Sequence, residues 1–221
     1  MTDMKVFERC LLFTGIDENE IKTVLECMSA VSKKYDKGQA VISVGEPIKN
    51  VGIVYSGRIN IVQEDHKGKT NIISIARQGE LLGVPFLYAN VEHSPVNMIC
   101  TEKSEVVFID YKKIIDNCNN PCVFNKKIIA NMLQILGSYT IKFTKKIEYI
   151  TKNTIREKLF SYLTDQSILN NSNTFTIPFN RQELADYLSV DRSALSNELS
   201  KMRDEKILNF EKNEFTLQSL R

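Results

Sequence analysis

NRQELADYLSVDRSALSNELSKMRDEK, residues 180–206, is the stretch that decides the fold of the C-terminal part of the chain. Asn180 and Glu183 have the spacing of a capping box, in which each side chain satisfies a free backbone N–H at the start of a helix. A helix is therefore predicted from about Arg181. Residues 189–191 then interrupt the apolar pattern, and Asp191 is a good N-cap for a second helix. The segment predicts two short helices joined by a tight turn.

The second of these helices is predicted to be amphipathic. Leu195, Leu199 and Met202 repeat at spacings of four and three and form one buried stripe. The opposite face carries polar side chains that can hydrogen-bond base edges or phosphates, as a recognition helix presents them to the major groove of DNA. With two residues from the start of the first helix, the predicted DNA-binding residues are Arg181, Gln182, Arg192, Ser193, Ser196, Asn197 and Lys201.

The residues around the two helices strengthen this interpretation, since amphipathic helix pairs also occur in proteins that never bind nucleic acid. Short β-rich runs lie at 175–177, 207–210 and 215–217, and with the helices they predict a winged helix-turn-helix. Charge adds no support, because residues 151–221 hold five Lys and five Arg against four Asp and six Glu. DNA contact is therefore expected to depend on the local placement of Arg181 and Arg192, with Lys201.

The overall composition is that of a globular protein, with 43% hydrophobic and 25% charged residues in 221. No stretch approaches the roughly 18 apolar residues that a membrane span needs, and the first five residues do not begin a secretory signal. The five cysteines are an odd, scattered set, which indicates reduced thiols and no disulfide framework. These features predict a cytoplasmic protein.

Upstream of the helix-turn-helix the periodicity changes twice. Residues 1–30 are predicted to be helical, with Asp17 as a cap. From Lys34 to Asp110, short β-branched runs alternate with glycines, a pattern typical of an antiparallel barrel, sandwich or jelly-roll. These runs lie at 41–44, 51–55, 59–62, 72–75, 98–100 and 106–109. The chain is thus expected to have an α+β fold with an N-terminal β-roll.

After Pro121 the period is helical for about 30 residues. One apolar seam along this helix steps by four and three and comprises Ile129, Leu133, Leu136, Phe143, Ile147 and Ile150, with Thr140 in register. A second stripe at Ile128, Met132, Ile135 and Tyr139 lies beside it. Such a wide apolar face needs two partners, so one stripe is expected to cover the β-roll and the other a second copy of the chain. A single helix buried within a monomer is the alternative. A homodimer would suit a palindromic double-stranded DNA site.

The order of β-roll, long helix and winged helix-turn-helix resembles the Crp/Fnr family of bacterial transcription regulators over essentially the whole chain. The most specific motifs are Gly38 with Gly45-Glu46-Pro47, Tyr55-Ser56-Gly57, the stretch Gln78 to Gly83, Asp110 to Lys113, and Arg181 to Leu188. The resemblance implies a sensor domain at 1–120, a dimerisation helix at 121–150 and a DNA-binding domain at 151–221. It also implies a sequence-specific regulator, activator or repressor, with RNA polymerase as a partner. No enzymatic activity is expected, because the sequence has no phosphate loop, no Gly-x-Ser-x-Gly elbow, no His-Glu-x-x-His motif and only two histidines.

The resemblance also allows the ligand site to be checked. Family members that bind cyclic nucleotides use an acidic residue for the ribose and an Arg-Ser pair for the cyclic phosphate, whereas this chain has Val84, Ser94 and Pro95 at these positions. Because an unpaired buried phosphate is heavily penalised, neither cyclic AMP nor cyclic GMP is expected to bind. The expected effector pocket suits an apolar or weakly polar small molecule, or no ligand, and comprises Val84, Pro85, Phe86, Ser94, Pro95, Ser138, Tyr139 and Thr140.

Other sensing chemistries have less support in the sequence. Cys10 and Cys27 are too few and too far apart for the N-terminal cysteine group of an iron–sulfur sensor, so no metal site is predicted. No cofactor is expected, with haem on His93 as the alternative. Cys118 and Cys122 could form a redox switch, but a pair of unrelated thiols is the favoured interpretation. A regulator responding to haem or redox state, or a structural cyclic-nucleotide-type protein without DNA function, are the competing hypotheses.

The recognition helix departs from the family pattern. The family often presents a Glu and an Arg four residues apart, and here these positions hold Ser193 and Asn197, after Arg192. An Asn side chain can bond adenine N6 and N7 together, and an Arg side chain can bond guanine O6 and N7. The preferred half-site is therefore expected to differ from the family's commonest one.

Overall fold

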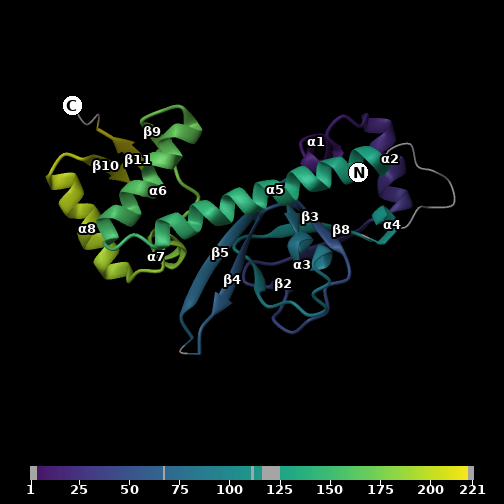
Figure 1. Ribbon diagram of the computed structural model, residues 1–221, viewed down its shortest axis with the longest axis horizontal. Coiled ribbons are helices and arrows are strands. Elements are labelled where there is room, and N and C mark those ends of the chain that lie inside the picture. The colour runs from purple at the N-terminus through teal and green to yellow at the C-terminus, as the bar shows by residue number, and fades with distance from the viewer. Residues whose placement is uncertain (1–3, 67, 111, 116–124, 219–221) are drawn as a thin grey trace. The chain divides into compact units, whose positions relative to one another are not determined.

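The computed structural model describes residues 4–66, 68–110, 112–115 and 125–218 (Figure 1). The chain forms two compact units, one of residues 1–69 and 73–140 and the other of residues 70–72 and 141–221. Two elements contribute to both units, the strand β5 (Thr70–Arg77) and the long helix α5 (Asn125–Ile150). Each unit has its own buried core.

The first unit opens with short helices that close one part of the core. These are α1 (Lys5–Glu8), the 3-10 turn η1 (Leu11–Phe13) and α2 (Glu18–Cys27). The start of α2 is fixed by a capping box in which the Asp17 N–H donates to Glu20 Oε2 at 3.0 Å. Among the described residues 4–30, the predicted helical character is found in these three short pieces, and the capping role of Asp17 is confirmed.

Two four-stranded antiparallel sheets form the β-roll. One has the order β1-β8-β3-β6 and the other β2-β7-β4-β5. The strands not yet given are β1 (Val31–Tyr35), β2 (Ala40–Ile42), β3 (Val51–Ser56), β4 (Arg58–Glu64), β6 (Leu81–Leu82), β7 (Asn97–Cys100) and β8 (Ser104–Ile109). Five of the six predicted β runs are strands throughout, and the run at 41–44 is a strand only as far as Ile42. Gly57 turns β3 into β4 with φ +86°, and a Cβ there would collide with Ser104, so only glycine fits this position.

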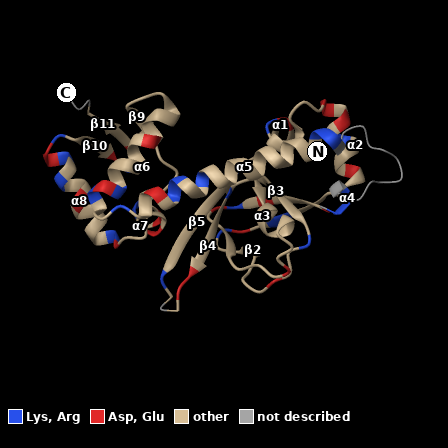
Figure 2. Ribbon diagram, viewed as in Figure 1, with Lys and Arg blue, Asp and Glu red and all other residues tan. Residues whose placement is uncertain are grey.

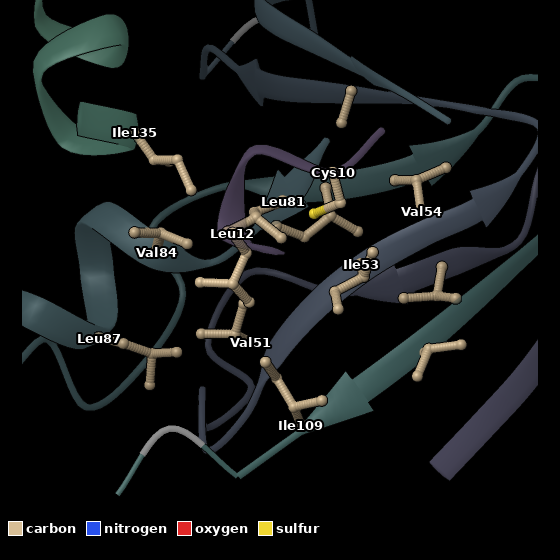
Figure 3. Close-up of a cluster of buried hydrophobic side chains, with 14 of the residues drawn as sticks. Cys10, Leu12, Val51, Ile53, Val54, Leu81, Val84, Leu87, Ile109 and Ile135 are labelled. Carbon is tan, nitrogen blue, oxygen red and sulfur yellow. The ribbon is translucent and has the colours of Figure 1, made fainter. Parts of the chain in front are cut away.

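Three helices follow the strands or lie between them, namely α3 (Val84–Tyr88), α4 (Lys112–Ile115) and α5. One face of α5 enters the core of the first unit, where Ile128, Met132 and Ile135 are almost completely buried. Figure 3 shows Ile135 facing the side chains that line the roll, among them Val84. Part of the other stripe is solvent-exposed in the single chain, with Ile129, Leu133 and Ile147 46%, 66% and 59% exposed, whereas Leu136 packs against the core. The two stripes of α5 therefore face different surroundings.

The second unit is a winged helix-turn-helix. It contains α6 (Ile155–Asn170), α7 (Arg181–Leu188), α8 (Arg192–Asp204) and a three-stranded sheet of order β10-β11-β9. The strands are β9 (Thr174–Thr176), β10 (Leu208–Glu211) and β11 (Glu214–Leu217). The sequence predicted that α6 would end near Leu163, which is wrong, because the helix continues to Asn170 and ends at Asn171 in the left-handed conformation.

A cluster of aromatic rings joins the end of α5 to the helix-turn-helix. Tyr149 meets Tyr162 edge to face at 5.5 Å between ring centroids, and Phe179 stacks on Tyr187 at 4.7 Å. The Tyr149 hydroxyl also donates to Asp165 Oδ2 at 2.7 Å. The last turns of α5 are thus part of the core of the second unit.

The predicted α+β class, with a β-roll, a long helix and a winged helix-turn-helix in this order, is confirmed. In the part of the chain that the structure describes, no helix is both long and apolar enough to cross a membrane.

Candidate functional site

The first helix of the motif begins where its capping box predicts. The Asn180 N–H donates to Glu183 Oε2 at 2.9 Å, and Asn180 Oδ1 accepts from the Glu183 N–H at 3.0 Å. Leu184, Ala185 and Leu188 are fully buried and orient α7. Ser189 ends the helix with φ +55°, which starts the turn into the next helix.

The second helix presents a polar face to solvent. Asp191 Oδ1 accepts from the Ala194 N–H at 2.8 Å and caps α8, as predicted. Leu195, Leu199 and Met202 are fully buried, so their stripe fixes the rotation of the helix. The predicted reading residues lie on the other side: Arg192, Ser193, Asn197 and Lys201 are exposed, and Ser196 is half-buried.

The back of α8 is held by Arg156 of α6. Arg156 Nε donates to Glu198 Oε1 at 2.6 Å, and the two Nη atoms donate to the two oxygens of Glu205 at 2.7 and 2.8 Å. This fork geometry is the strong form of an arginine–carboxylate pair. The guanidinium lowers the pKa of Glu205, and the two carboxylates raise the pKa of Arg156. The sequence gives no sign of these two contacts, since no local pattern links residues that are 42 and 49 positions apart.

The start of α7 is in contact with the wing. Arg181 is half-buried, and its guanidinium lies 4.6 Å from the Phe210 ring centroid and 5.0 Å from that of Phe215. Burial lowers the pKa of Arg181. The neighbouring Gln182 is exposed and donates from Nε2 to Asp186 Oδ1 at 2.8 Å. All seven predicted DNA-binding residues therefore lie on α7 and α8. Of these seven, Arg181 is the one whose side chain packs on aromatic rings.

Positive and negative charges are mixed over this unit. Figure 2 shows Lys and Arg interspersed with Asp and Glu along α8. The recognition helix itself holds three basic residues against two acidic ones, so its attraction for DNA is local and small.

The predicted effector residues on the roll are largely turned inward. Val84 is fully buried (Figure 3), and Ser94 is 2% exposed. The Ser94 hydroxyl donates to the Val96 carbonyl at 2.6 Å and accepts from the Val96 N–H at 3.3 Å. Pro85 and Phe86 are half-buried, and Pro95 is exposed. The Ser94 hydroxyl is therefore used within its own turn.

The predicted effector residues on α5 also have partners within the chain. Ser138 and Thr140 donate to the carbonyls of Ile135 and Leu136 on their own helix. The Tyr139 hydroxyl donates to the Leu81 carbonyl at 2.6 Å, and burial raises the pKa of this phenol. This bond connects the long helix to β6, three residues before Val84.

A cavity of about 800 Å³ lies elsewhere on the first unit. Its lining includes the apolar Ile48 and Leu87 and the charged or titratable Lys49, Glu92, His93, Asp110 and Lys112, but none of the eight predicted effector residues. Within the described ranges, no group of three His, Cys, Asp or Glu side chains is placed to hold a metal ion. Cys118 and Cys122 lie outside the residues that the structure describes.

Comparison with known proteins assigns both units. Residues 32–120 match the cyclic nucleotide-binding domain family, and residues 157–221 match the Crp-like helix-turn-helix domain family. The cAMP-activated global transcriptional regulator CRP of Escherichia coli is 20% identical over 176 residues, which cover 79% of this chain and 83% of CRP.

Solved structures share the fold over most of the chain. CLP of Xanthomonas campestris, a c-di-GMP-responsive global regulator, superposes with a TM-score of 0.74 at 18% identity, over 92% of this chain and 100% of CLP. FixK2 of Bradyrhizobium japonicum has a TM-score of 0.68 at 14% identity, over 86% of this chain and 93% of its own. Because the two matched families follow one another in the order found here, the chain belongs to the Crp/Fnr family of transcription regulators.

Proposed function

We propose that this regulator binds a palindromic double-stranded DNA site as a homodimer, with α8 of each copy in the major groove, and acts on RNA polymerase from there. The observation that supports the proposal best is the exposed polar face of α8, behind which Arg156 and the buried leucines fix the helix. Two such helices about 34 Å apart would match two half-sites separated by one turn of DNA.

The reading of the half-site is assigned to two side chains on this face. In this proposal Asn197 bonds adenine, Arg192 bonds guanine or a phosphate, and Lys201 contributes charge toward the DNA backbone; the exposure of all three side chains supports it. The remaining proposed contacts are Gln182, Ser193 and Ser196. Because the domain is neutral overall, few phosphate contacts are expected, and the salt dependence of binding should be shallow.

Selection of binding sites from a random DNA pool tests this proposal. Wild type should enrich a two-fold symmetric site. Asn197→Ala should cost about 1–3 kcal/mol and relax one base position in each half-site, whereas Lys201→Ala should weaken binding to every sequence and lower the salt slope by about 1.

Lys22→Ala on α2, a surface lysine of the first unit, serves as the control and should bind like wild type. Failure of the wild-type protein to enrich any site would contradict the proposal.

We further propose that the β-roll takes no cyclic nucleotide. Val84 offers no carboxylate to a ribose, and the Ser94 hydroxyl is already bonded to the Val96 backbone. Titration calorimetry with cyclic AMP and cyclic GMP should give no heat of binding at ligand concentrations up to about 1 mM, which corresponds to a binding free energy weaker than about −4 kcal/mol. Micromolar binding of either nucleotide would overturn this part of the proposal.

A further inference from the structure

The wing is a hairpin whose last rungs lie close to α7. In β10 and β11, Phe210 pairs with Phe215 and Glu211 pairs with Glu214, and the turn Lys212–Asn213 closes the hairpin. Lys212 has φ +51°, in the left-handed region that two-residue hairpin turns use. The aromatic pair is thus one rung from the tip.

The tip of the wing is tied to the segment that precedes α7. The Ile177 N–H donates to the Asn213 carbonyl at 2.9 Å, and Asn213 Nδ2 donates to the Ile177 carbonyl at 3.2 Å. Ile177 itself is 1% exposed. The Ile177 amide proton therefore reports whether the wing is docked.

Arg181 makes the second connection. It is the first residue of α7, where the capping box fixes the backbone, and its guanidinium lies over both rings of the Phe210–Phe215 rung. Its Nη1 atom is buried and has no hydrogen-bond partner among the residues described. A nitrogen enclosed in this way cannot reach a DNA phosphate without leaving the rings. A planar guanidinium can stack on ring faces, whereas a lysine ammonium is a strongly hydrated point charge.

We infer that Arg181 is a positioning residue: it acts on DNA binding through Phe210 and Phe215, holding the wing against the first turn of α7, and makes no phosphate contact of its own. The inference rests on the proposed DNA-binding function and refines it. The exposed Gln182, one residue further along the same turn, is the group whose placement toward DNA depends on this packing.

Binding to the selected DNA site at several salt concentrations separates positioning from contact. Arg181→Lys and Arg181→Met should both weaken binding several-fold with the salt slope unchanged. Phe210→Leu should weaken binding at least as much, because the Arg203 guanidinium also lies over this ring, 5.3 Å from its centroid. Its effect should be less than additive with that of Arg181→Met, since both changes remove the contact between Arg181 and Phe210. The control Lys201→Met, at the proposed contact to the DNA backbone, should lower the slope by about 1.

The opposite pattern would overturn the inference. A direct phosphate contact predicts that Arg181→Lys binds like wild type, that Arg181→Met lowers the slope by about 1, and that its effect adds to that of Phe210→Leu. The base preference of each variant is measured at one temperature, well below its unfolding midpoint. A loss of DNA binding caused by unfolding alone is thereby excluded.

Hydrogen exchange of the free protein tests the same inference without DNA. Protection of the Ile177 amide should fall in Arg181→Lys and Arg181→Met and stay at the wild-type level in Lys201→Met. Unchanged protection in both Arg181 variants would refute the positioning role. If wild type binds no DNA while Ile177 protection depends on Arg181, the proposed function fails and the packing role of Arg181 stands.

Discussion

At the scale of single residues, Cys10 shows how burial controls reactivity. Its thiol is 1% exposed in the core of the first unit (Figure 3), and burial raises its pKa to about 12. The thiolate is the nucleophilic form, so Cys10 should resist alkylation in the native protein at pH 8, whereas the exposed Cys27 should react. Labelling with iodoacetamide followed by peptide mass spectrometry measures both sites in one sample.

Labelling after denaturation in guanidinium chloride is the control, and both cysteines should then react at similar rates. Modification of Cys10 as fast as Cys27 in native buffer would contradict the burial seen here. The raised pKa also makes the free energy of unfolding depend on pH, because the folded state keeps the Cys10 thiol protonated. The contribution of this thiol to stability is complete below the unfolded pKa of about 8.5 and is lost as pH rises toward 12. Cys10→Ala should remove this part of the alkaline loss.

Single residues also show where sequence reasoning ends. Asn180 and Asp191 were predicted as caps because capping depends on backbone groups two or three positions away. Arg181 was predicted as a DNA contact, and the sequence carries no sign of its rings, which are 29 and 34 positions further along the chain. Arg156 was not singled out for the same reason. Side-chain roles set by tertiary packing require the fold.

At the scale of elements, the cap of α8 is open to a direct test. Asp191→Ala removes the acceptor for the Ala194 N–H, and loss of such a cap costs about 1 kcal/mol of unfolding free energy. Urea unfolding followed by circular dichroism measures this difference.

Asp191→Asn is the matched control, because an asparagine oxygen can accept the same bond. It should cost clearly less than Asp191→Ala. Equal losses in the two variants would show that the charge of Asp191 at the helix N-terminus, and not the hydrogen bond, supplies the stability.

The elements that the sequence did not predict lack the apolar periodicity by which strands and helices are identified in a sequence. β1 is largely exposed and carries polar residues such as Lys33 and Lys34, so it has no apolar alternation. β6 has only two residues, and α3 is five residues of mostly apolar chain after Gly83, too short for a period. The end of α6 was missed because its last turn exposes Ile168 and Leu169, which reverses the usual pattern.

At the scale of the whole molecule, the exposed stripe of α5 predicts the oligomeric state. Ile129, Leu133 and Ile147 are 46%, 66% and 59% exposed in the single chain, and they belong to the seam proposed to meet a second copy. Leu133→Glu should convert the dimer to monomer at micromolar concentration and weaken DNA binding. Because Leu133 is exposed in the single chain, the substitution removes no core packing and should not lower the unfolding midpoint of the monomer. Sedimentation velocity reports the change.

Gln134→Glu introduces the same side chain at the neighbouring exposed position and should leave the dimer intact. A dimer that persists in Leu133→Glu would place the interface elsewhere. A wild-type protein that sediments as a monomer at every concentration would remove the dimer from the proposed function.

The sharing of α5 between two cores has a consequence for building chimaeras from this family. The boundary between the units falls at Thr140 and Ile141, inside the helix, while Tyr149 packs with Tyr162 and Asp165 of the winged unit. If two family members were joined in the segment between α5 and α6, after Ile150, the recipient would gain a DNA-binding unit whose aromatic cluster lacks Tyr149. An exchange that begins at Ile141 transfers that cluster whole.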